Sequence, residues 1–380
     1  MTQNKSLSGR VPDYVARVRP YVPGKPIEEV ERELGLTAIK LASNENPLGP
    51  SPKAVEAMAK FLRQSHRYPD AGGYYLRKKL AERHNIEMDR IVLGAGSTEL
   101  IQLLNHVYLG PGRQGLSSEG SFVMFPMSVG AAGGEAILVP QRDYAYDLDA
   151  LAARLGPAVR VVYLANPNNP TGTMFTADEL ERFLEKVPED VLVVLDEAYC
   201  DYVDRPDYSR SLDSVRTGRY LIVLRTFSKV HGLAGLRIGY GIGHPEVISA
   251  LNKVRSPFNV TSLALVAALA ALDDSDHIAR SLESNRRGLA LLSRELPALG
   301  LKCIPSVANF LYAETGRDPR EDFQALLRMG VIVRPLGFMG MPAGLRITVG
   351  TEEENQRLLE AFARLMTSAP ATAGGQRGGA

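Results

Sequence analysis

The hydrophobic positions of this chain form short, continuous runs that alternate with longer segments of mixed polarity. Five runs rich in aliphatic residues predict buried strands, at residues 90–93, 136–139, 159–164, 191–195 and 220–224. Between them, a helical pattern is present at residues 98–109, 148–155 and 176–186. Thr176 and Glu179 are spaced as in a capping box at the start of the last of these helices. Continuous apolar strands that alternate with helices indicate an α/β fold with a mostly parallel sheet covered by helices.

The chain after residue 272 has a different pattern. A long helix is predicted over residues 276–296, and shorter strand-like and helical patterns follow it, at 308–312, 322–328, 331–334, 345–349 and 352–365. We therefore predict a large domain over residues 46–272 and a smaller α+β domain over residues 273–366.

The two ends of the chain differ from the rest in composition. Residues 1–45 contain several prolines and glycines, so we predict an N-terminal arm that belongs to the small domain rather than a part of a core. Residues 367–380 are mostly small or polar, and we expect them to form a disordered tail.

Composition narrows the possible functions. The 44 Lys and Arg residues against 43 Asp and Glu leave a net charge of +1, which argues against binding to nucleic acid or to a membrane surface through basic residues. The longest apolar stretch, residues 263–272, is too short to cross a bilayer, which needs roughly 20 residues. Because residues 1–10 are polar and the chain has two cysteines, we expect a cytoplasmic protein without a signal peptide or a disulfide framework. The six histidines show no ligand spacing, so we predict no metal site.

A glycine-containing loop, Gly94 to Glu99, lies between a predicted strand and a predicted helix. Glycine lets the backbone approach an anion and the helix N-terminus offers free N–H groups, so this loop could cradle a phosphate. An ordinary tight turn explains the loop alone equally well. It is not a dinucleotide fingerprint, because Glu99 replaces the third glycine, and it contains no Walker lysine.

Two further segments place polar side chains at strand ends, where ligands of parallel α/β proteins bind. Residues 166–172, Asn-Pro-Asn-Asn-Pro-Thr-Gly, predict a rigid turn with amide donors, although a purely structural turn is the alternative. Asp196 ends the strand at 191–195 and Tyr199 follows three residues later. A carboxylate after five buried apolar residues is costly unless a cation, such as a protonated pyridine nitrogen, meets it. The alternative is that Asp196 caps the next segment.

Lys229 follows the strand at 220–224, and it is one of 11 lysines among the 44 basic residues. A lysine at a buried strand end can lose its proton by desolvation and act as nucleophile and base in Schiff-base chemistry. Ser228 and Arg237 would then offer a hydroxyl and a guanidinium to a phosphate. The alternative is a lysine in a surface loop.

Taken together and in this order, these segments resemble the pyridoxal-phosphate aminotransferases of fold type I, class I/II. The resemblance covers residues 21–363, nearly the whole chain. Within that superfamily the chain is most similar to the histidinol-phosphate aminotransferases, and the distinguishing segments are 21–25, 41–47, 68–70, 227–237 and 345–350.

The resemblance implies roles for individual residues in holding pyridoxal 5'-phosphate. Lys229 would form the Schiff base with the cofactor, and Asp196 would keep its pyridine nitrogen protonated. Asn169 and Tyr199 would donate hydrogen bonds to the phenolic oxygen of the ring, while Phe122 stands where the family usually has a stacked tyrosine. Five residues would hold the cofactor phosphate: Ser97, Thr98, Ser228, Arg237 and, from the neighbouring subunit, Tyr68. The last of these contacts implies a homodimer with shared active sites.

The resemblance also implies the substrate-binding residues. Arg346 resembles the family's arginine for the substrate carboxylate, which a planar guanidinium binds with two hydrogen bonds. Histidinol phosphate has no carboxylate at its amine-bearing carbon, so the arginine would accept the phosphate instead, assisted by Arg334 and Tyr21. A solvated salt bridge is the alternative for Arg334. Asn44 and Asn169 would complete this part of the site.

The function implied is a ping-pong aminotransferase of histidine biosynthesis, which interconverts histidinol phosphate and 2-oxoglutarate with imidazole-acetol phosphate and glutamate. The enzymatic alternatives are an aromatic-amino-acid aminotransferase and a threonine-phosphate decarboxylase of the same lineage. Thr98, where relatives often carry Asp or Asn, and Phe258, where some carry Tyr, leave this choice open. A cofactor-binding sensor within a transcription regulator is the non-enzymatic alternative. It needs a DNA-binding module, for which residues 1–45 have neither the length nor the helix-turn-helix pattern.

Overall fold

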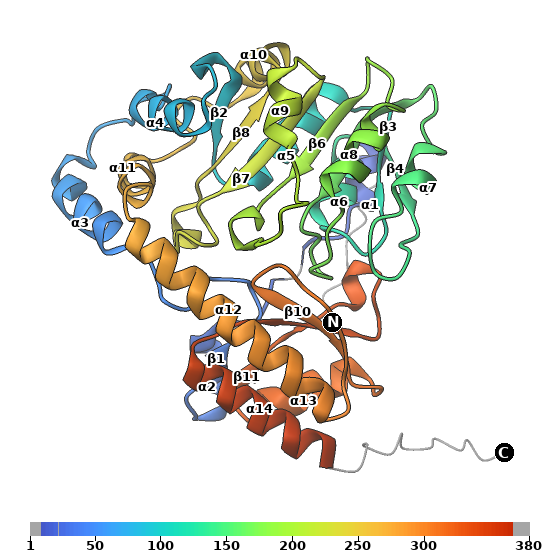
Figure 1. Cartoon of the computed structure of the whole chain (residues 1–380). Helices are drawn as coiled ribbons and strands as arrows, with labels where there is room; N and C mark the ends of the chain where they lie inside the picture. Colours follow the sequence, from blue (N-terminus) through green and yellow to red (C-terminus); the bar gives the residue numbers. More distant parts are fainter. Residues whose placement is uncertain (1–8, 22, 368–380) are drawn as a thin grey trace.

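The computed structural model describes residues 9–21 and 23–367, which form two layered regions linked by a long helix (Figure 1). The upper region in Figure 1 contains a seven-stranded sheet, and the lower region contains a four-stranded sheet. The linking helix, α12 (Ser275–Ala298), starts beside the upper region and runs along the lower one. The predicted fold class is confirmed: a mostly parallel sheet covered by helices, accompanied by a smaller α+β region.

The large sheet has one antiparallel strand. Its strands lie in the order β2 (Ile91–Gly94), β8 (Gly239–Gly243), β7 (Leu221–Thr226), β6 (Leu192–Asp196), β5 (Val159–Ala165), β3 (Gln114–Ser118) and β4 (Glu135–Val139). β8 is antiparallel to both neighbours and the other pairs are parallel. The apolar pattern does not predict β3 or β8, because both are rich in Gly or Ser. Glycine is required at Gly239 of β8, since a Cβ there would lie 2.8 Å from both the Arg225 carbonyl oxygen and the Ser97 amide nitrogen.

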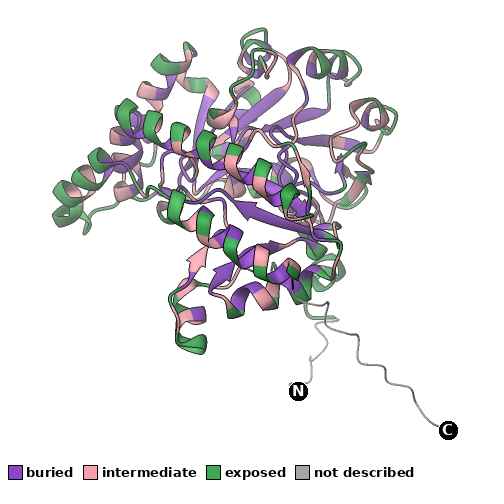
Figure 2. Ribbon diagram, turned by 60° about the horizontal axis from the view of Figure 1, so that its bottom comes forward, coloured by how far each residue is buried: buried purple, intermediate pink, exposed green. Residues whose placement is uncertain are grey.

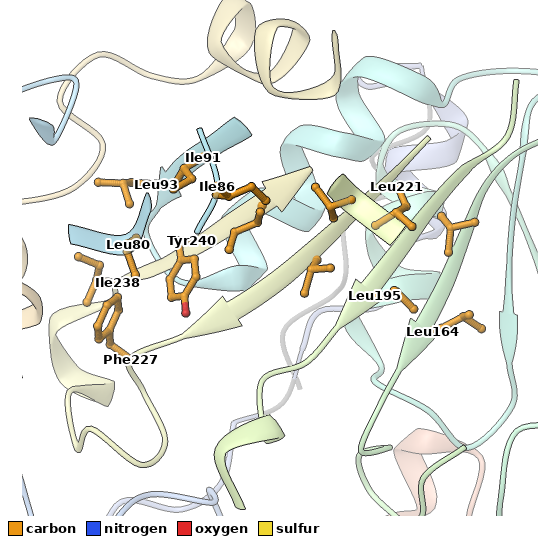
Figure 3. Close-up of a cluster of buried hydrophobic side chains, with 14 of the residues drawn as sticks. Leu80, Ile86, Ile91, Leu93, Leu164, Leu195, Leu221, Phe227, Ile238 and Tyr240 are labelled. Atoms are coloured by element: carbon orange, nitrogen blue, oxygen red, sulfur yellow. The ribbon is translucent and has the colours of Figure 1, made fainter. Parts of the chain in front are cut away.

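Helices cover both faces of this sheet, and each face has its own apolar core. One face packs against α3 (Pro52–Phe61), α4 (Tyr74–His84), α7 (Leu148–Ala152), α8 (Ala177–Leu184), α9 (Ser211–Arg216) and α11 (Ser262–Ala271). The other face packs against α5 (Ser97–Tyr108), α6 (Met124–Ala131) and α10 (Pro245–Val254). Alternate residues of one strand supply the two cores: Leu195 lies in the first, shown in Figure 3, and Val194 in the second. Figure 2 shows the resulting layers, with buried strands between helices whose outer faces are exposed.

The smaller region is built on an antiparallel sheet. Its strands lie in the order β12 (Arg334–Pro335), β13 (Gly344–Thr348), β10 (Phe310–Glu314) and β9 (Lys302–Ile304). Its core also takes side chains from α12, α13 (Pro319–Arg328) and α14 (Glu352–Thr367). The described part of the chain also contains five short 3-10 helices: η1 (Leu62–Gln64), η2 (Met88–Arg90), η3 (Cys200–Tyr202), η4 (Ala234–Leu236) and η5 (Gly337–Met339).

The N-terminal segment differs from the prediction of an arm that takes no part in a core. α1 (Asp13–Arg17) lies against α6, but α2 (Ile27–Leu34) and β1 (Ile39–Lys40) belong to the smaller region. β1 pairs in parallel with β11 (Val331–Ile332), and Val30 is buried against Leu327 and Ile332. The segment thus packs on a strand about 290 residues further along the chain, a pairing that local composition does not reveal.

The last helix of the smaller region ends one residue beyond the predicted domain boundary at residue 366. Thr367, predicted to begin a disordered tail, is the last residue of α14. Residues 368–380 lie outside the described part of the chain. Across the part that is described, no helix is both long and apolar enough to span a bilayer.

The predicted capping box at the start of α8 is present and its energetic contribution can be tested. The Glu179 amide donates to the Thr176 hydroxyl at 3.3 Å, and the Thr176 amide donates to the Glu179 carboxylate at 2.7 Å. Thr176→Ala should lower the free energy of unfolding by about 1 kcal/mol without changing the function. Urea titration measures the loss. The control Ser293→Ala, at an exposed position inside α12, should change stability by a few tenths of a kcal/mol at most. Equal losses in the two variants would contradict a capping role.

Candidate active site

A cavity of about 380 Å³ opens at the carboxyl ends of the large sheet's parallel strands, where that sheet meets the smaller region. Thirteen of the fourteen residues predicted for the site line this cavity: Tyr21, Asn44, Ser97, Thr98, Phe122, Asn169, Asp196, Tyr199, Ser228, Lys229, Arg237, Arg334 and Arg346. The fourteenth, Tyr68, lies elsewhere on the surface. The structure therefore brings together residues that are separated by up to 325 positions in the chain.

One end of the cavity is a concave cluster of hydrogen-bond donors. Gly96 has a φ of +80° at the start of α5, and a Cβ there would lie 2.5 Å from Arg237 Nη2. The Arg237 guanidinium donates to the Ser228 hydroxyl at 3.3 Å. Ser97 is the first residue of α5, so its helix N-terminus faces the same space. Guanidinium, hydroxyl groups and a helix N-terminus form a suitable cradle for a phosphate.

Glu99, which replaces the third glycine of a dinucleotide fingerprint, has a structural explanation. Its carboxylate accepts hydrogen bonds from the Ala95 amide at 2.5 Å and from Asn259 Nδ2 at 2.6 Å. It thereby closes the turn that carries the cradle and ties it to the segment after α10. The loop is both a tight turn and part of the cavity.

In the turn at residues 166–172, two asparagines hold the backbone and the third faces the cavity. Asn166 is bound to the Phe175 backbone through both its amide nitrogen and its oxygen, and Asn168 donates to the Gly120 carbonyl. The peptide bond between Asn166 and Pro167 is cis. Asn169 instead faces the cavity, where its Nδ2 donates to the Tyr199 hydroxyl at 3.3 Å. The turn is therefore fastened by Asn166 and Asn168 and presents the side chain of Asn169 to the cavity.

Asp196 ends β6 and is 5 % exposed. Burial raises the pKa of its carboxyl group to about 6, while the hydrogen bond from the Ala198 amide and the Lys229 charge act in the opposite direction. An ionised Asp196 is thus disfavoured in the unliganded protein and would be favoured by a cation placed beside it. The acceptor contact with Ala198 also agrees with the alternative prediction that Asp196 caps the following turn.

Tyr199 is the centre of a small hydrogen-bond network. Its hydroxyl accepts from Asn44 Nδ2 at 2.9 Å, in addition to Asn169. Asn44 has a φ of +55°, and its backbone and side chain are both bound to the Thr348 hydroxyl of β13. The network therefore joins the large sheet to the smaller region across the cavity.

Lys229 lies in the cavity, close to Ser43 and Tyr199. Its Nζ is 3.5 Å from the Ser43 carbonyl and 5.2 Å from the centroid of the Tyr199 ring. The lysine is half-buried and lines the cavity, which argues against its interpretation as a lysine of a surface loop.

Two arginines that line the cavity lie opposite each other on neighbouring strands of the smaller region. Arg334 on β12 pairs with Arg346 on β13 in the antiparallel sheet, and both are buried. Arg346 donates to Asn169 Oδ1 and to the Ala42 carbonyl, each at 2.6 Å, but its buried Nε has no hydrogen-bond partner among the described residues. Burial and the neighbouring Arg334 charge lower the pKa of Arg346. Like charges placed opposite each other are destabilising unless an anion lies between or beside them.

Tyr68 is the predicted site residue that the structure does not bring to the cavity. It is 82 % exposed, and its ring stacks on Phe258 at a centroid distance of 4.7 Å.

The structure adds cavity residues that the sequence interpretation did not single out. They line the cavity between or beside the predicted residues: Gly24, Ala42, Ser43, Glu45, Ala165, Pro167, Ala198, Thr226, Ala234 and Gly235. Ser43 and Glu45 lie within segment 41–47, one of the segments that carry the family resemblance. Their place in that segment could have identified them as cavity residues.

Comparison with known proteins agrees with this geometry. The sequence profile of the family described as "Aminotransferase class I and II" matches residues 37–362. The chain belongs to this aminotransferase family. The chain is 48 % identical over 358 residues to histidinol-phosphate aminotransferase 2 of Pseudomonas fluorescens, covering 93 % of this chain and 97 % of the relative. It is 47 % identical to the histidinol-phosphate aminotransferase of Moorella thermoacetica, and the match covers 93 % of this chain and 92 % of the relative.

A solved structure confirms the fold of this aminotransferase. The histidinol-phosphate aminotransferase from Sinorhizobium meliloti in complex with pyridoxal-5'-phosphate superposes with a TM-score of 0.87 at 28 % identity, covering 94 % of this chain and 98 % of that one. The predicted resemblance, which covered residues 21–363, is thereby confirmed at the level of sequence and of fold.

The raised pKa of Asp196 makes the stability of the cofactor-free aminotransferase depend on pH. The folded protein keeps a proton on Asp196 up to a pKa of about 6, whereas the unfolded chain releases it at about 3.9. Stability contributed by this group therefore falls as the pH rises from about 4 to 6. Asp196→Asn should remove this loss and raise the free energy of unfolding at pH 7.5 by about 1–3 kcal/mol, with a smaller gain at pH 4.5.

Urea unfolding of the cofactor-free protein at the two pH values measures this difference. The control Glu189→Gln changes an exposed carboxylate. It should change the free energy of unfolding by the same small amount at both pH values. An Asp196→Asn variant less stable than the wild type at both pH values would contradict the claim that an ionised Asp196 costs stability.

Proposed function

We propose that this aminotransferase uses pyridoxal 5'-phosphate to interconvert histidinol phosphate and 2-oxoglutarate with imidazole-acetol phosphate and glutamate, a step of histidine biosynthesis. The observation that carries the proposal is a single cavity with two separate sites for anions. One is the cradle around Arg237, and the other is the pair Arg334 and Arg346. The names of the relatives at 47–48 % identity support the same substrate.

The residues present fit the cofactor. The cradle of Ser97, Ser228 and Arg237 suits its phosphate, and it is a space that a Cβ at Gly96 would obstruct. Asp196 at the floor of the cavity would pair with the protonated ring nitrogen, which offsets the cost of burying an ionised carboxylate. Asn169 and Tyr199 would hold the phenolic oxygen, and the Phe122 ring would lie against the cofactor ring.

When bound, the cofactor supplies an electron-accepting ring and carries the amino group between the two substrates. The chain's own residues then orient the substrate and move protons. Lys229 is assigned the transfer of the proton from the amine-bearing carbon of the substrate, because its amine lies within the cavity beside Tyr199. Arg346, which lines the cavity, fixes that carbon by binding the substrate's anionic group through its guanidinium.

The arginine pair favours a phosphomonoester. A phosphate carries more negative charge than a carboxylate and has three acceptor oxygens, so it can accept from both guanidiniums at once. Glutamate would use the same place through a carboxylate. The interpretation of Arg334 as a solvated salt bridge is not supported, since the side chain is buried at the cavity.

We further propose a homodimer in the cytoplasm. The exposed Tyr68 and Phe258 rings support a dimer in which Tyr68 reaches the cofactor phosphate of the other subunit. Cys200 and Cys303 are free thiols in the structure, which suits a reducing compartment.

Lys229→Ala should abolish the absorbance band of the holoenzyme near the visible edge and lower activity roughly a thousandfold or more. The change removes both the amine that attaches the cofactor and the base. Absorbance spectroscopy and a coupled assay measure the two effects, and the exposed Lys186 provides the control Lys186→Ala. An unchanged spectrum in Lys229→Ala would refute the assignment.

A half-reaction screen tests the substrate with the wild-type holoenzyme. Histidinol phosphate should change the spectrum with a higher kcat/KM than phenylalanine, because the arginine pair binds its phosphate. A preference for phenylalanine would instead identify an aromatic-amino-acid aminotransferase, and release of carbon dioxide from threonine phosphate would identify a decarboxylase.

Hybrid dimers test whether Tyr68 acts across the subunit interface. Tyr68→Ala subunits mixed with Lys229→Ala subunits form hybrids in which one site has both defects and the other site has neither. Random mixing should therefore restore about one quarter of wild-type activity, although each variant alone is impaired. Activity equal to the average of the two separate variants would show that Tyr68 does not act across the interface.

A further inference from the structure

Phe338 lies beside Arg334 at the mouth of the cavity, but it was not among the predicted site residues and does not line the cavity wall. The Arg334 guanidinium carbon is 4.3 Å from the centroid of the Phe338 ring and 5.6 Å from that of Tyr21. The two rings meet edge to face, with centroids 6.2 Å apart and planes at 76°. Together they form an aromatic corner around the guanidinium.

This corner separates Arg334 from water. Tyr21 and Phe338 are 49 % and 42 % exposed, whereas Arg334 behind them is 8 % exposed. The Tyr21 hydroxyl accepts a hydrogen bond from Arg334 Nη2 at 3.4 Å. Phe338 offers only its ring face, which attracts a guanidinium electrostatically without competing for its N–H groups. The ring therefore holds the plane of the Arg334 guanidinium, which lines the cavity, without occupying any of its N–H groups.

The segment that carries Phe338 is fastened by backbone hydrogen bonds and by two buried side chains. η5 lies in the turn between β12 and β13, where the Leu336 amide donates to the Gly344 carbonyl and the Met339 amide donates to the Leu336 carbonyl. Leu336 and Met339 are buried and anchor this turn. Phe338 lies between these two buried residues in the chain, and its ring packs against the Arg334 guanidinium.

The same anchors connect the turn to the large sheet. Leu336 and Met339 pack with Tyr312 and with partly buried Val123 and Tyr144, which belong to the other region. Val123 follows Phe122, a residue of the cavity wall. The position of Phe338 is therefore tied to both regions that enclose the cavity.

From this arrangement we infer that Phe338 is a positioning residue for substrate choice: its ring holds the Arg334 guanidinium in the orientation that binds the substrate's phosphate. The inference rests on the proposed function. Phe338 touches neither the reacting carbon nor the cofactor site, so it should influence binding of the phosphorylated substrate and leave the chemical step unchanged.

The experiment compares histidinol phosphate with histidinol, which has the same amine and imidazole but no phosphate. In Phe338→Ala holoenzyme, KM for histidinol phosphate should rise roughly three- to tenfold, while kcat changes less than twofold. The kcat/KM for histidinol should stay the same, so the preference for the phosphorylated substrate falls by the same three- to tenfold. The absorbance spectrum of the holoenzyme should not change.

Three further variants separate stacking from simple coverage of Arg334. Phe338→Tyr keeps the ring face and should restore the wild-type preference, whereas Phe338→Leu keeps an apolar cover without a ring and should resemble Phe338→Ala. Tyr14→Ala is the matched control, because it removes a similarly exposed ring that lies against Gly133. A Phe338→Leu variant with the wild-type preference, or an equal loss with both substrates, would overturn the inference.

Inorganic phosphate keeps this test independent of the proposed substrate. It should inhibit the glutamate half-reaction competitively, with an inhibition constant that rises three- to tenfold in Phe338→Ala. If the wild type does not convert histidinol phosphate but phosphate inhibition still weakens in this variant, the proposed function fails and the role of Phe338 stands. If histidinol phosphate is converted equally well by the wild type and the variant, the role of Phe338 fails and the proposed function stands.

Discussion

This active site depends on the cost of keeping charges of opposite sign out of water within one cavity. Burial raises the pKa of Asp196 to about 6 and lowers the pKa of both Arg334 and Arg346. Each charge is therefore held in a place where the protein alone stabilises it poorly, and a bound group of opposite charge offsets that cost. A cofactor and an anionic substrate are such groups, so the same electrostatics that weakens the empty site strengthens binding.

The alternation of side chains along a strand separates charges that act in the site from charges that only stabilise the fold. Asp196 faces the cavity, but the next residue, Glu197, is buried away from it and accepts from Arg225 at 2.8 Å and from Ser211 at 2.6 Å. Asp196 is the last residue of β6 and Glu197 directly follows it, with its amide still bonded to the Leu224 carbonyl of β7. The two consecutive side chains therefore point in different directions, as successive side chains of an extended chain do. The turn at residues 166–172 makes the same division, with Asn166 and Asn168 fastening its backbone and Asn169 facing the cavity.

The smaller region completes the site. It provides both arginines, and through Thr348 it holds Asn44, which in turn donates to Tyr199. The turn with Phe338 packs on both regions, so the orientation of Arg334 is linked to the wall that contains Phe122. Recognition of the substrate anion and placement of the cofactor are thereby joined through direct contacts.

The sequence by itself determined the alternation of strands and helices, the loops after the strands and thirteen of the residues that line the cavity. The strands, helices and loops could be predicted because apolar runs and glycine turns are local features of the chain. The residues of the cavity followed from the resemblance of its ordered motifs to the aminotransferase family. The tertiary structure alone decided that β3 and β8 join the sheet, that residues 27–42 pack on β11, and that Arg334 faces Arg346. It also placed Phe338 over Arg334. Each of these depends on packing between segments or on the path of a turn, for which no local pattern of hydrophobic and polar residues carries a signal.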